Sequence, residues 1–477
     1  MQAAPKGKKN REDKEYVVVS YVFVLVFISL IGYLVYYNVA LKDEILSSSY
    51  NRRQNQAAEH VIRGDIKSLD GEVLAYTKVE EDGTETRIYP YDDLFAHAVG
   101  YVNNGKGGLE AIANYHLLTS HAFILERIQN EFKEEKNDGD TVVTTLDYSL
   151  QKAAYDALGS YNGAVVAIEP DTGRILAMVS KPDYNPNTLA AEWDDIINDE
   201  SSSVLLNRAT QGLYPPGSVY KIITSLSYLR HHGNVDAFTH ECHGELTLSD
   251  HTIHCYAGSV HGVEDFRKAF SSSCNTAFAQ IGVELGAEAL KETSNDLLFN
   301  SKLPVDLIYN KSRFNLSSEA GNATIMQTAF GQGDTLVSPM HMALLTCAIA
   351  NEGVLMDTYM IDHIENNNGD VVSTTKPRAY KTLLTEDEAS LLKDMMTQVV
   401  ESGTASSLNG NEYTAAGKTG SAEFYKEDGS MGTHSWFVGF SNVEDPDLVV
   451  CVLAEGAGTG SSVAVPISEE IFDEYYN

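Results

Sequence analysis

The chain has 477 residues, with 67 acidic against 34 basic side chains and a formal net charge of −33. Hydrophobic residues make up 43% and charged residues 21%, which indicates a folded protein with a sizeable core and excludes global disorder. The acidic balance disfavours a nucleic-acid partner, because most of the surface would repel a polyanion. Five cysteines are too few for a disulfide scaffold.

An uncharged segment near the N-terminus predicts one membrane-spanning helix. Residues 16–41 carry no formal charge, and at about 1.5 Å per residue they span a hydrocarbon layer of roughly 30 Å. Basic residues precede the segment, so we expect residues 1–15 in the cytoplasm and the rest of the chain outside the cell membrane. A cleaved signal peptide and a buried core helix are the alternatives. The segment is long for a signal peptide, and Asn38-Val39-Ala40 is a poor cleavage site.

The rest of the chain is expected to form an α+β protein with two domains. Residues 42–144 begin with a polar stalk and continue with short apolar runs separated by turn signals, which indicate a small extended α+β pedestal domain. Residues 145–477 are expected to form the larger domain, an antiparallel sheet flanked by helices.

Five strands are expected in the larger domain, two before and three after a helical middle. A turn at residues 170–173 (Pro-Asp-Thr-Gly) predicts a hairpin between the first two strands. The helical region is expected from about Val219 to Ala350, and a capping box formed by Thr385 and Glu388 predicts another helix to about Val400. The expected strands are 163–168, 175–179, 413–424, 436–440 and 448–453.

The segment 214–221 (Tyr-Pro-Pro-Gly-Ser-Val-Tyr-Lys) combines a helix start with a candidate nucleophile. Two prolines and a glycine end any preceding helix, so Ser218 is expected at a helix N-terminus, where backbone N–H groups favour developing negative charge. Lys221 follows three residues later on the same helix face, and a lysine of lowered pKa can take the proton of a serine. Alone, Ser-x-x-Lys is common by chance and also fits an ordinary helix with a surface lysine.

Two further motifs give this pair its significance. Ser273-Cys274-Asn275 stands 55 positions after Ser218, and residues 418–421 (Lys-Thr-Gly-Ser) begin 143 positions beyond Asn275 in an expected strand. The small residues there would let a peptide backbone pair with the strand edge. The charge of Lys418 would disfavour protonation of Lys221.

This order of motifs resembles that of penicillin-binding proteins and class A β-lactamases, which share Ser-x-x-Lys, Ser-Asp-Asn and Lys-Thr-Gly. After the membrane segment the chain is similar to class B (monofunctional) penicillin-binding proteins of the FtsI/PbpA type. Residues 63–66 (Arg-Gly-Asp-Ile) resemble the pedestal signature of that family, and residues 434–439 (His-Ser-Trp-Phe-Val-Gly) resemble part of its transpeptidase domain. Two positions depart from the pattern: Cys274 replaces an aspartate, and Ser421 replaces a commoner threonine.

The resemblance implies five catalytic residues. Ser218 would attack the carbonyl between the last two D-alanines of a peptidoglycan stem peptide, and Lys221 would take its proton. Ser273 would relay a proton to the departing D-alanine, Lys418 would tune the field around it, and Asn275 would bind the substrate amide.

The resemblance also implies a substrate-binding strand at residues 419–421. Thr419 would hold the terminal carboxylate of the peptide, with Gly420 beside it. The backbone N–H groups of Ser421 and Ser218 would form the oxyanion hole.

The implied activity is that of a peptidoglycan D,D-transpeptidase that β-lactams inhibit covalently and that needs no cofactor or metal. A D,D-carboxypeptidase would differ only in using water as acceptor, and a non-catalytic scaffold or β-lactam sensor is the remaining alternative. A β-lactamase is disfavoured because no Glu-x-x-Leu-Asn stands between Asn275 and Lys418. The resemblance further implies a SEDS-family (RodA/FtsW type) glycan polymerase as partner.

Cys242 and Cys255 are 13 positions apart and lie among the histidines at 243, 251 and 254. The spacing does not fit a Cys-x-x-Cys zinc knuckle. We expect either a disulfide that closes a hairpin or two free thiols, and a metal site remains as the third reading.

Overall fold

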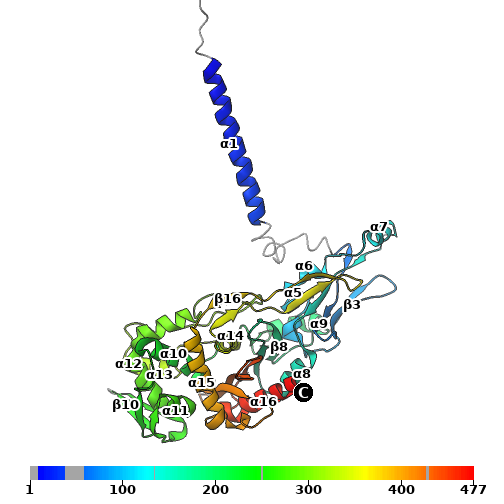
Figure 1. Cartoon of the computed structure of the whole chain (residues 1–477). Helices are drawn as coiled ribbons and strands as arrows, with labels where there is room; N and C mark the ends of the chain where they lie inside the picture. The colour runs from blue at the N-terminus through cyan, green and yellow to red at the C-terminus, as the bar shows by residue number, and fades with distance from the viewer. Residues whose placement is uncertain (1–8, 38–57, 134, 249–250, 426–428) are drawn as a thin grey trace, which may run out of the picture. The chain divides into compact units, whose positions relative to one another are not determined.

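The computed structural model describes residues 9–37, 58–133, 135–248, 251–425 and 429–477 (Figure 1). The chain divides into two compact units, Met1–Glu59 and His60–Asn477. Each unit is described by itself below.

The first unit contains the helix α1, Lys9–Tyr36. Its segment Tyr16–Tyr36 has 21 residues and a mean hydropathy of 2.6, so it is long and apolar enough to cross a membrane. This is the helix expected from residues 16–41. The end of that prediction at 38–41, the stalk up to residue 57 and residues 1–8 of the N-terminal tail lie outside the described residues.

The second unit begins with the pedestal, whose six-stranded sheet has the order β15-β14-β6-β2-β3-β4. Its strands are β2 (Ile66–Lys67), β3 (Val73–Val79), β4 (Glu85–Ile88), β6 (Thr141–Thr144), β14 (Ile361–Glu365) and β15 (Val371–Thr374). The helices of this region are α4 (Ala96–Val99), α5 (Gly108–Ile112), α6 (Asn114–Leu117) and α7 (Ile124–Lys133). β1 (Val61–Ile62) pairs in parallel with β5 (Asn137–Asp138).

Two strands of this sheet come from far along the chain. β14 pairs antiparallel with β6, and Ile364 lies opposite Val142. β6 in turn pairs in parallel with β2. One hydrogen-bonded sheet therefore contains strands from both sides of the domain boundary predicted between residues 144 and 145. The boundary itself remains a prediction.

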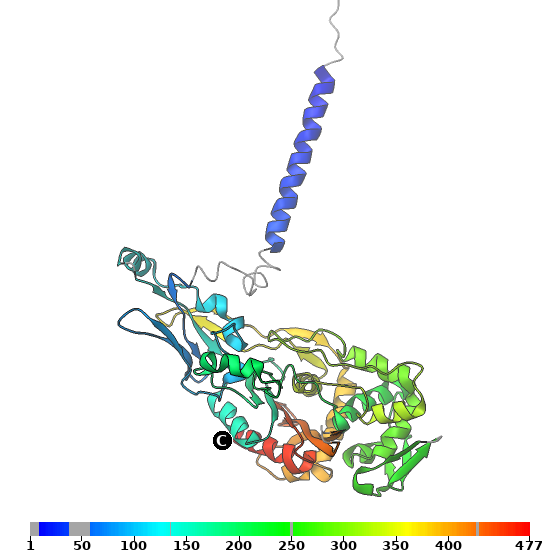
Figure 2. The ribbon, with the colours of Figure 1, turned by 180° about the vertical axis from the view of Figure 1, so that it is seen from behind.

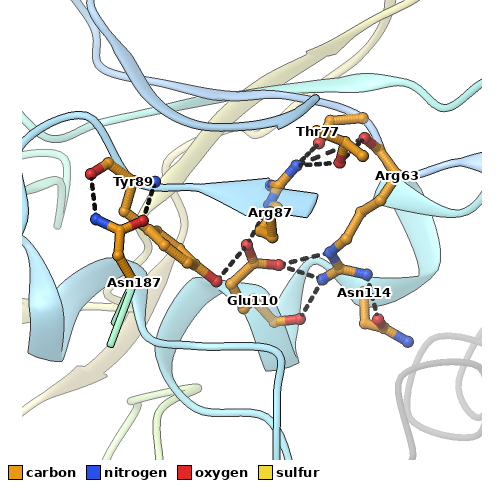
Figure 3. A network of polar contacts seen from close by, with 8 residues as sticks. Arg63, Thr77, Arg87, Tyr89, Glu110, Asn114 and Asn187 are labelled. Carbon is orange, nitrogen blue, oxygen red and sulfur yellow. Dashed lines mark hydrogen bonds and ion pairs between the residues drawn. The ribbon is translucent and has the colours of Figure 1, made fainter. Parts of the chain in front are cut away.

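A buried ionic network fixes the pedestal, as Figure 3 shows. Glu110, with no exposed side-chain surface, accepts hydrogen bonds from Arg63 Nε at 2.6 Å, from Arg87 Nε at 2.7 Å and from the Tyr89 hydroxyl at 3.2 Å. Burial alone would raise the pKa of Glu110, but the two guanidinium groups hold it below its ordinary value. The side-chain amide of Asn187 accepts from the Tyr89 N–H and donates to the Tyr89 carbonyl, both at 2.9 Å, and this ties the network to the larger domain.

The larger domain is built on a five-stranded antiparallel sheet in the order β17-β18-β19-β7-β8. Its strands are β7 (Gly163–Ile168), β8 (Ile175–Lys181), β17 (Ala415–Tyr425), β18 (Met431–Ser441) and β19 (Leu448–Ala454). The two early and three late strands were expected from the sequence, and so was the hairpin between β7 and β8.

Helices cover this sheet. Every residue of β7 and β19 is buried, which requires cover on both faces. α8 (Tyr148–Leu158) packs on β8, α16 (Val465–Tyr476) packs on α8 and β19, and α14 (Pro339–Ala350), buried along its whole length, packs on β7 and β19. α15 (Glu386–Ser402) packs on β17 and starts with the expected capping box, in which Thr385 and Glu388 bond each other's backbone N–H groups.

The middle of the domain forms a lobe that lies at the end opposite the pedestal in both views (Figures 1 and 2). Its helices are α10 (Lys221–His232), α11 (Phe266–Ser271), α12 (Asn275–Asp296) and α13 (Asn322–Ala329). The expectation of a helical run from Val219 to Ala350 is wrong over residues 297–321, which form no helix, and over residues 239–248 and 251–265. These last two stretches form β9 (Thr239–Cys242) with β12 (Gly262–Asp265) and β10 (Glu245–Leu248) with β11 (His251–His254). Burial alternates with period two along β9, and glycines with positive φ at 244, 258 and 262 turn the chain.

Short elements complete the unit. They are α9 (Leu189–Asn198), β13 (Val354–Met356) paired with β16 (Ala379–Thr382), and the single turns at Gly217–Tyr220, Tyr256–Gly258, Ser406–Leu408 and Gly460–Ala464.

Candidate active site

Ser218 lies in a single 3₁₀ turn, Gly217–Tyr220, that leads directly into α10. Gly217 has φ +54°, and a Cβ there would approach the Ser421 carbonyl oxygen of β17 to 2.9 Å. A Cβ on Gly420 would likewise come within 3.1 Å of the Pro216 carbonyl oxygen. The glycines on both sides therefore let the turn that carries Ser218 lie directly against strand β17.

A second turn holds Ser273 between α11 and α12. Ser273 has φ +57°, which is rare for a residue with a side chain, and its N–H donates to the Phe270 carbonyl at 3.1 Å. Asn275 starts α12, and its Nδ2 donates to the His254 carbonyl of β11 at 3.2 Å. The lobe thus presents both polar side chains of the Ser-x-Asn motif at the start of one helix.

Two buried lysines meet at Ser273. Lys221 Nζ donates to the Ser273 carbonyl at 2.7 Å, to Ser273 Oγ at 3.2 Å and to Asn275 Oδ1 at 2.8 Å. Lys418 Nζ, from strand β17, donates to Ser273 Oγ at 2.9 Å and to the Thr419 carbonyl at 3.2 Å. The structure therefore brings Lys221, Ser273, Asn275 and Lys418 together. In the described part of the chain, no hydrogen bond joins the Ser218 hydroxyl to Lys221 Nζ.

Burial weakens the charge on both amines. Lys221 and Lys418 have no exposed surface. Burial lowers the pKa of Lys221 to about 8, against the opposing effects of Cys274, Cys255 and Glu264. Burial and then the nearby charge of Lys221 lower the pKa of Lys418 well below its usual range. The like-charge repulsion expected on Lys221 thus acts on Lys418, and burial alone accounts for the lowered pKa of Lys221.

The strand segment after Lys418 offers polar groups beside the turn of Ser218. Thr419 Oγ1 lies 2.6 Å from Thr404 Oγ1, and Ser421 Oγ accepts from the Gly460 N–H at 3.3 Å. Thr404 lies in the loop after α15. The sequence did not predict its contact with Thr419, because Thr404 belongs to no motif and precedes Thr419 by 15 positions. The adjacent Gly403, where that helix ends, is the only local signal that the chain turns there.

The Gly-Gln-Gly segment at 331–333 supports the serine turn from the other side. The Gly217 N–H donates to the Gly331 carbonyl at 2.9 Å, and Gly331 has φ +85°. A Cβ at Gly331 would lie 1.8 Å from the Gly217 carbonyl oxygen. The segment is a tight turn whose first position requires glycine.

The cysteine pair singled out in the sequence carries no disulfide. The sulfurs of Cys242 and Cys255 are 3.7 Å apart, and both residues are free and buried. Cys274 and His261 lie beside them, and the four ligand atoms are all within 4.8 Å of one another. The three histidines noted in the sequence are not members of this group.

The fold and the site together define a class of protein. They combine a five-stranded antiparallel sheet, a turn with Ser218 against one strand, a buried lysine pair and a Ser-x-Asn turn. This is the architecture of the penicillin-binding transpeptidases. The chain belongs to this family. Residues 163–473 match the penicillin-binding protein transpeptidase domain, and residues 63–142 match the penicillin-binding protein A dimerisation domain.

Three relatives match most of this chain over most of their own length. The peptidoglycan D,D-transpeptidase PbpA of Mycolicibacterium smegmatis is 31% identical over 85% of this chain and 87% of its own. The D,D-transpeptidase domain of a peptidoglycan glycosyltransferase from Eggerthella lenta has a TM-score of 0.77 at 31% identity, covering 87% of this chain and 97% of that one. The penicillin G acyl-enzyme of penicillin-binding protein A from M. tuberculosis has a TM-score of 0.78 at 28% identity, covering 87% of this chain and 99% of that one.

Proposed function

We propose that this chain is a peptidoglycan D,D-transpeptidase in which Ser218 forms the acyl-enzyme. The observation that carries the proposal is the hydroxyl of Ser273, held between Lys221 Nζ and Lys418 Nζ beside the turn of Ser218. Such an arrangement can pass protons between a nucleophile and a leaving group without a metal or nucleotide. Relatives that carry the name D,D-transpeptidase support the same reaction.

The reaction proceeds in two acyl transfers. Lys221 takes the proton of the Ser218 hydroxyl as Oγ attacks the carbonyl carbon between the two terminal D-alanines. The C–N bond breaks, the serine ester forms, and the terminal D-alanine leaves as a neutral amine after it receives a proton through Ser273. An amine of a neighbouring stem peptide then attacks the ester, loses a proton to the site and returns Ser218 to its hydroxyl form.

The strand β17 binds the substrate during these steps. The N–H groups of Ser218 and Ser421 stabilise the oxyanion, and donors of this kind contribute about 3–4 kcal/mol to the transition state. Thr419 binds the terminal carboxylate, with Gly420 beside it, and Asn275 binds the amide of the stem peptide. Lys418 maintains the field around the leaving amine.

β-Lactams acylate the same serine, since their strained amide mimics the terminal dipeptide. The penicillin G acyl-enzyme of the M. tuberculosis relative supports this assignment. Residues 16–41 anchor the chain by a single span with the N-terminus in the cytoplasm, and the catalytic domain works outside the membrane. The chain is divided into a tail (1–15), this anchor, a pedestal (42–144) and a catalytic domain (145–477), and its glycan strands come from a SEDS-family polymerase.

A fluorescent penicillin tests the nucleophile. Full-length protein in detergent should form a long-lived adduct that maps to Ser218, and Ser218→Ala should form none. An adduct that survives Ser218→Ala rejects the assignment. Lipid II, a polymerase and an acceptor peptide then separate the alternatives: cross-linked dimers indicate transpeptidation, release of D-alanine without dimers indicates a carboxypeptidase, and neither product indicates a scaffold or sensor.

A further inference from the structure

The lobe that carries Ser273 contains a compact cluster of one imidazole and three thiols. Cys242 ends strand β9, Cys255 follows strand β11, His261 precedes strand β12, and Cys274 precedes helix α12. The three cysteines are buried and His261 is half-buried. Four segments that are separate in the sequence therefore direct their ligand atoms to one point.

Four of the six distances between the ligand atoms are close to the edges of a metal-centred tetrahedron, and all six are within 4.8 Å. Bonds of about 2.3 Å to sulfur and about 2.0 Å to nitrogen give edges of roughly 3.8 Å between two sulfurs and roughly 3.5 Å between sulfur and nitrogen. In the cluster, Cys255 Sγ lies 3.7 Å from Cys242 Sγ and 3.8 Å from Cys274 Sγ. His261 Nδ1 lies 3.3 Å from Cys242 Sγ and 3.8 Å from Cys255 Sγ. A disulfide would need about 2.05 Å between sulfurs and would leave one thiol and the ring unused.

Polar groups lie close to the sulfurs. The Gly244 N–H donates to Cys242 Sγ at 3.4 Å, the Thr276 hydroxyl lies 3.2 Å from Cys274 Sγ, and the Cys255 thiol donates to Thr276 Oγ1 at 3.7 Å. Donors beside a metal ligand, such as the Gly244 N–H, orient it and stabilise its negative charge. Three thiolates and one imidazole in a closed tetrahedron are a ligand set that selects Zn²⁺.

We propose that Cys242, Cys255, His261 and Cys274 bind one Zn²⁺ ion, which positions Ser273 and Asn275 in the active site. Cys274 is the residue between these two. Asn275 also bonds the carbonyl of His254, whose neighbour Cys255 is a second ligand. Binding converts three thiols to thiolates and releases their three protons to solvent, while His261 contributes the lone pair of Nδ1.

The ion acts as a positioning element and touches no substrate. Ser273 holds a left-handed backbone conformation, which is unfavourable for an L-residue, so its turn needs support from the surrounding structure. Without the ion, the start of α12 is attached to β9 by the hydrogen bonds of His240 with Thr276 and Gln280, to β11 by the bond from Asn275 to the His254 carbonyl, and to both by weak contacts of thiols. Metal content is measured independently of any reaction, so this proposal and the proposed function fail separately.

The zinc site is tested by elemental analysis of the full-length chain. The protein is purified in detergent, without chelators, from cells supplied with zinc. We expect about one zinc per chain, and a drop of roughly tenfold in Cys242→Ser and in Cys255→Ser, because a closed structural site needs its four ligands. Cys347→Ala and Cys451→Ala are matched controls, since both cysteines are buried outside the cluster and should leave the content unchanged. If the cysteine variants do not fold, His261→Gln, at a half-buried position, serves in their place.

Two spectroscopic and kinetic readouts complete the test. Replacement of the ion by Co²⁺ should give the visible bands of tetrahedral cobalt with thiolate charge transfer, and His261→Gln should alter them. Metal-stripped protein should be acylated by fluorescent penicillin roughly tenfold more slowly and should recover with Zn²⁺, because the displaced Ser273 no longer meets both lysines. A chain without bound metal, or a Cys242–Cys255 disulfide by mass spectrometry, overturns the site. If the purified protein holds a full zinc ion and its acylation rate does not change when that zinc is stripped, the positioning role is overturned.

Discussion

Lys221 and Lys418 direct their Nζ atoms at the same oxygen, Ser273 Oγ, at 3.2 and 2.9 Å. Neither side chain has exposed surface, so water cannot screen one amine from the other. A hydroxyl that contacts two buried amines can exchange protons with both. Several expected outcomes follow from this contact and from the turns that maintain it.

The acylation rate should depend on the protonation of Lys221. A lysine that accepts the proton of Ser218 must be neutral, and burial lowers the pKa of Lys221 to about 8. The rate with fluorescent penicillin should therefore rise about tenfold per pH unit below pH 8 and level off above it. Stopped-flow labelling between pH 6 and 9 measures this profile. A flat profile over that range would remove Lys221 as the base.

Two substitutions at Ser273 should separate its hydroxyl from its backbone strain. Ser273→Ala and Ser273→Gly both remove the hydroxyl that contacts the two lysines and keep the carbonyl that accepts from Lys221, so both should lose most of the acylation rate, by about 10²-fold or more. Glycine tolerates φ +57° and alanine does not, so the glycine variant should be the more stable by about 1 kcal/mol. Thermal unfolding measures the difference. Ser271→Ala, whose hydroxyl bonds the Lys268 carbonyl, is the control and should acylate normally. Equal stability of the two Ser273 variants would contradict the assigned strain.

Gly331→Ala should disturb the turn of Ser218. Its new Cβ would lie 1.8 Å from the Gly217 carbonyl oxygen, so either the 331–333 turn or the serine turn must move. Gly369→Ala is a matched control because Gly369 has nearly the same φ, +83° against +85°, with open space around it. The control should lose only about 1 kcal/mol of stability. Gly331→Ala should lose more stability than the control and should also be acylated far more slowly. Thermal unfolding and labelling with fluorescent penicillin measure the two effects, and equal results for the two variants would contradict this prediction.

Glu110→Gln should destabilise the pedestal strongly. The substitution leaves the buried guanidinium groups of Arg63 and Arg87 facing each other without a counter-charge. Removing one partner of a buried ion pair costs about 3–5 kcal/mol. Glu85→Gln removes an exposed pair with Lys136 and should cost less than about 1 kcal/mol. Denaturant unfolding compares the two variants, and equal midpoints would show that the network contributes little.

The sequence predicted best the elements whose signals are local. A four-residue turn between two expected strands predicted the β7–β8 hairpin, and the capping box of Thr385 and Glu388 predicted the start of α15. The order of the motifs predicted that one active site contains Lys221, Ser273, Asn275 and Lys418. These signals work because each depends on residues that are neighbours in the chain or on a recurrent family pattern.

The features that the sequence did not predict depend on contacts across the fold. The four short strands between residues 239 and 265 were read as helix, since each is too brief to show a clear period. Thr404 reaches Thr419 only because α15 packs on β17. The partners of Cys242 could not be chosen from spacing, because His261 and Cys274 reach it through the pairing of β9 with β12 and the start of α12.

The pairing of β6 with β14 has a consequence for recombination between relatives. A chimera that exchanged only residues 60–144 would place a foreign β6 against the recipient's own β14, and mismatched side chains would meet along the ladder. A compatible exchange must also transfer residues 361–374, more than two hundred positions away. A single crossover between residues 144 and 361 would therefore separate the two segments that form this sheet.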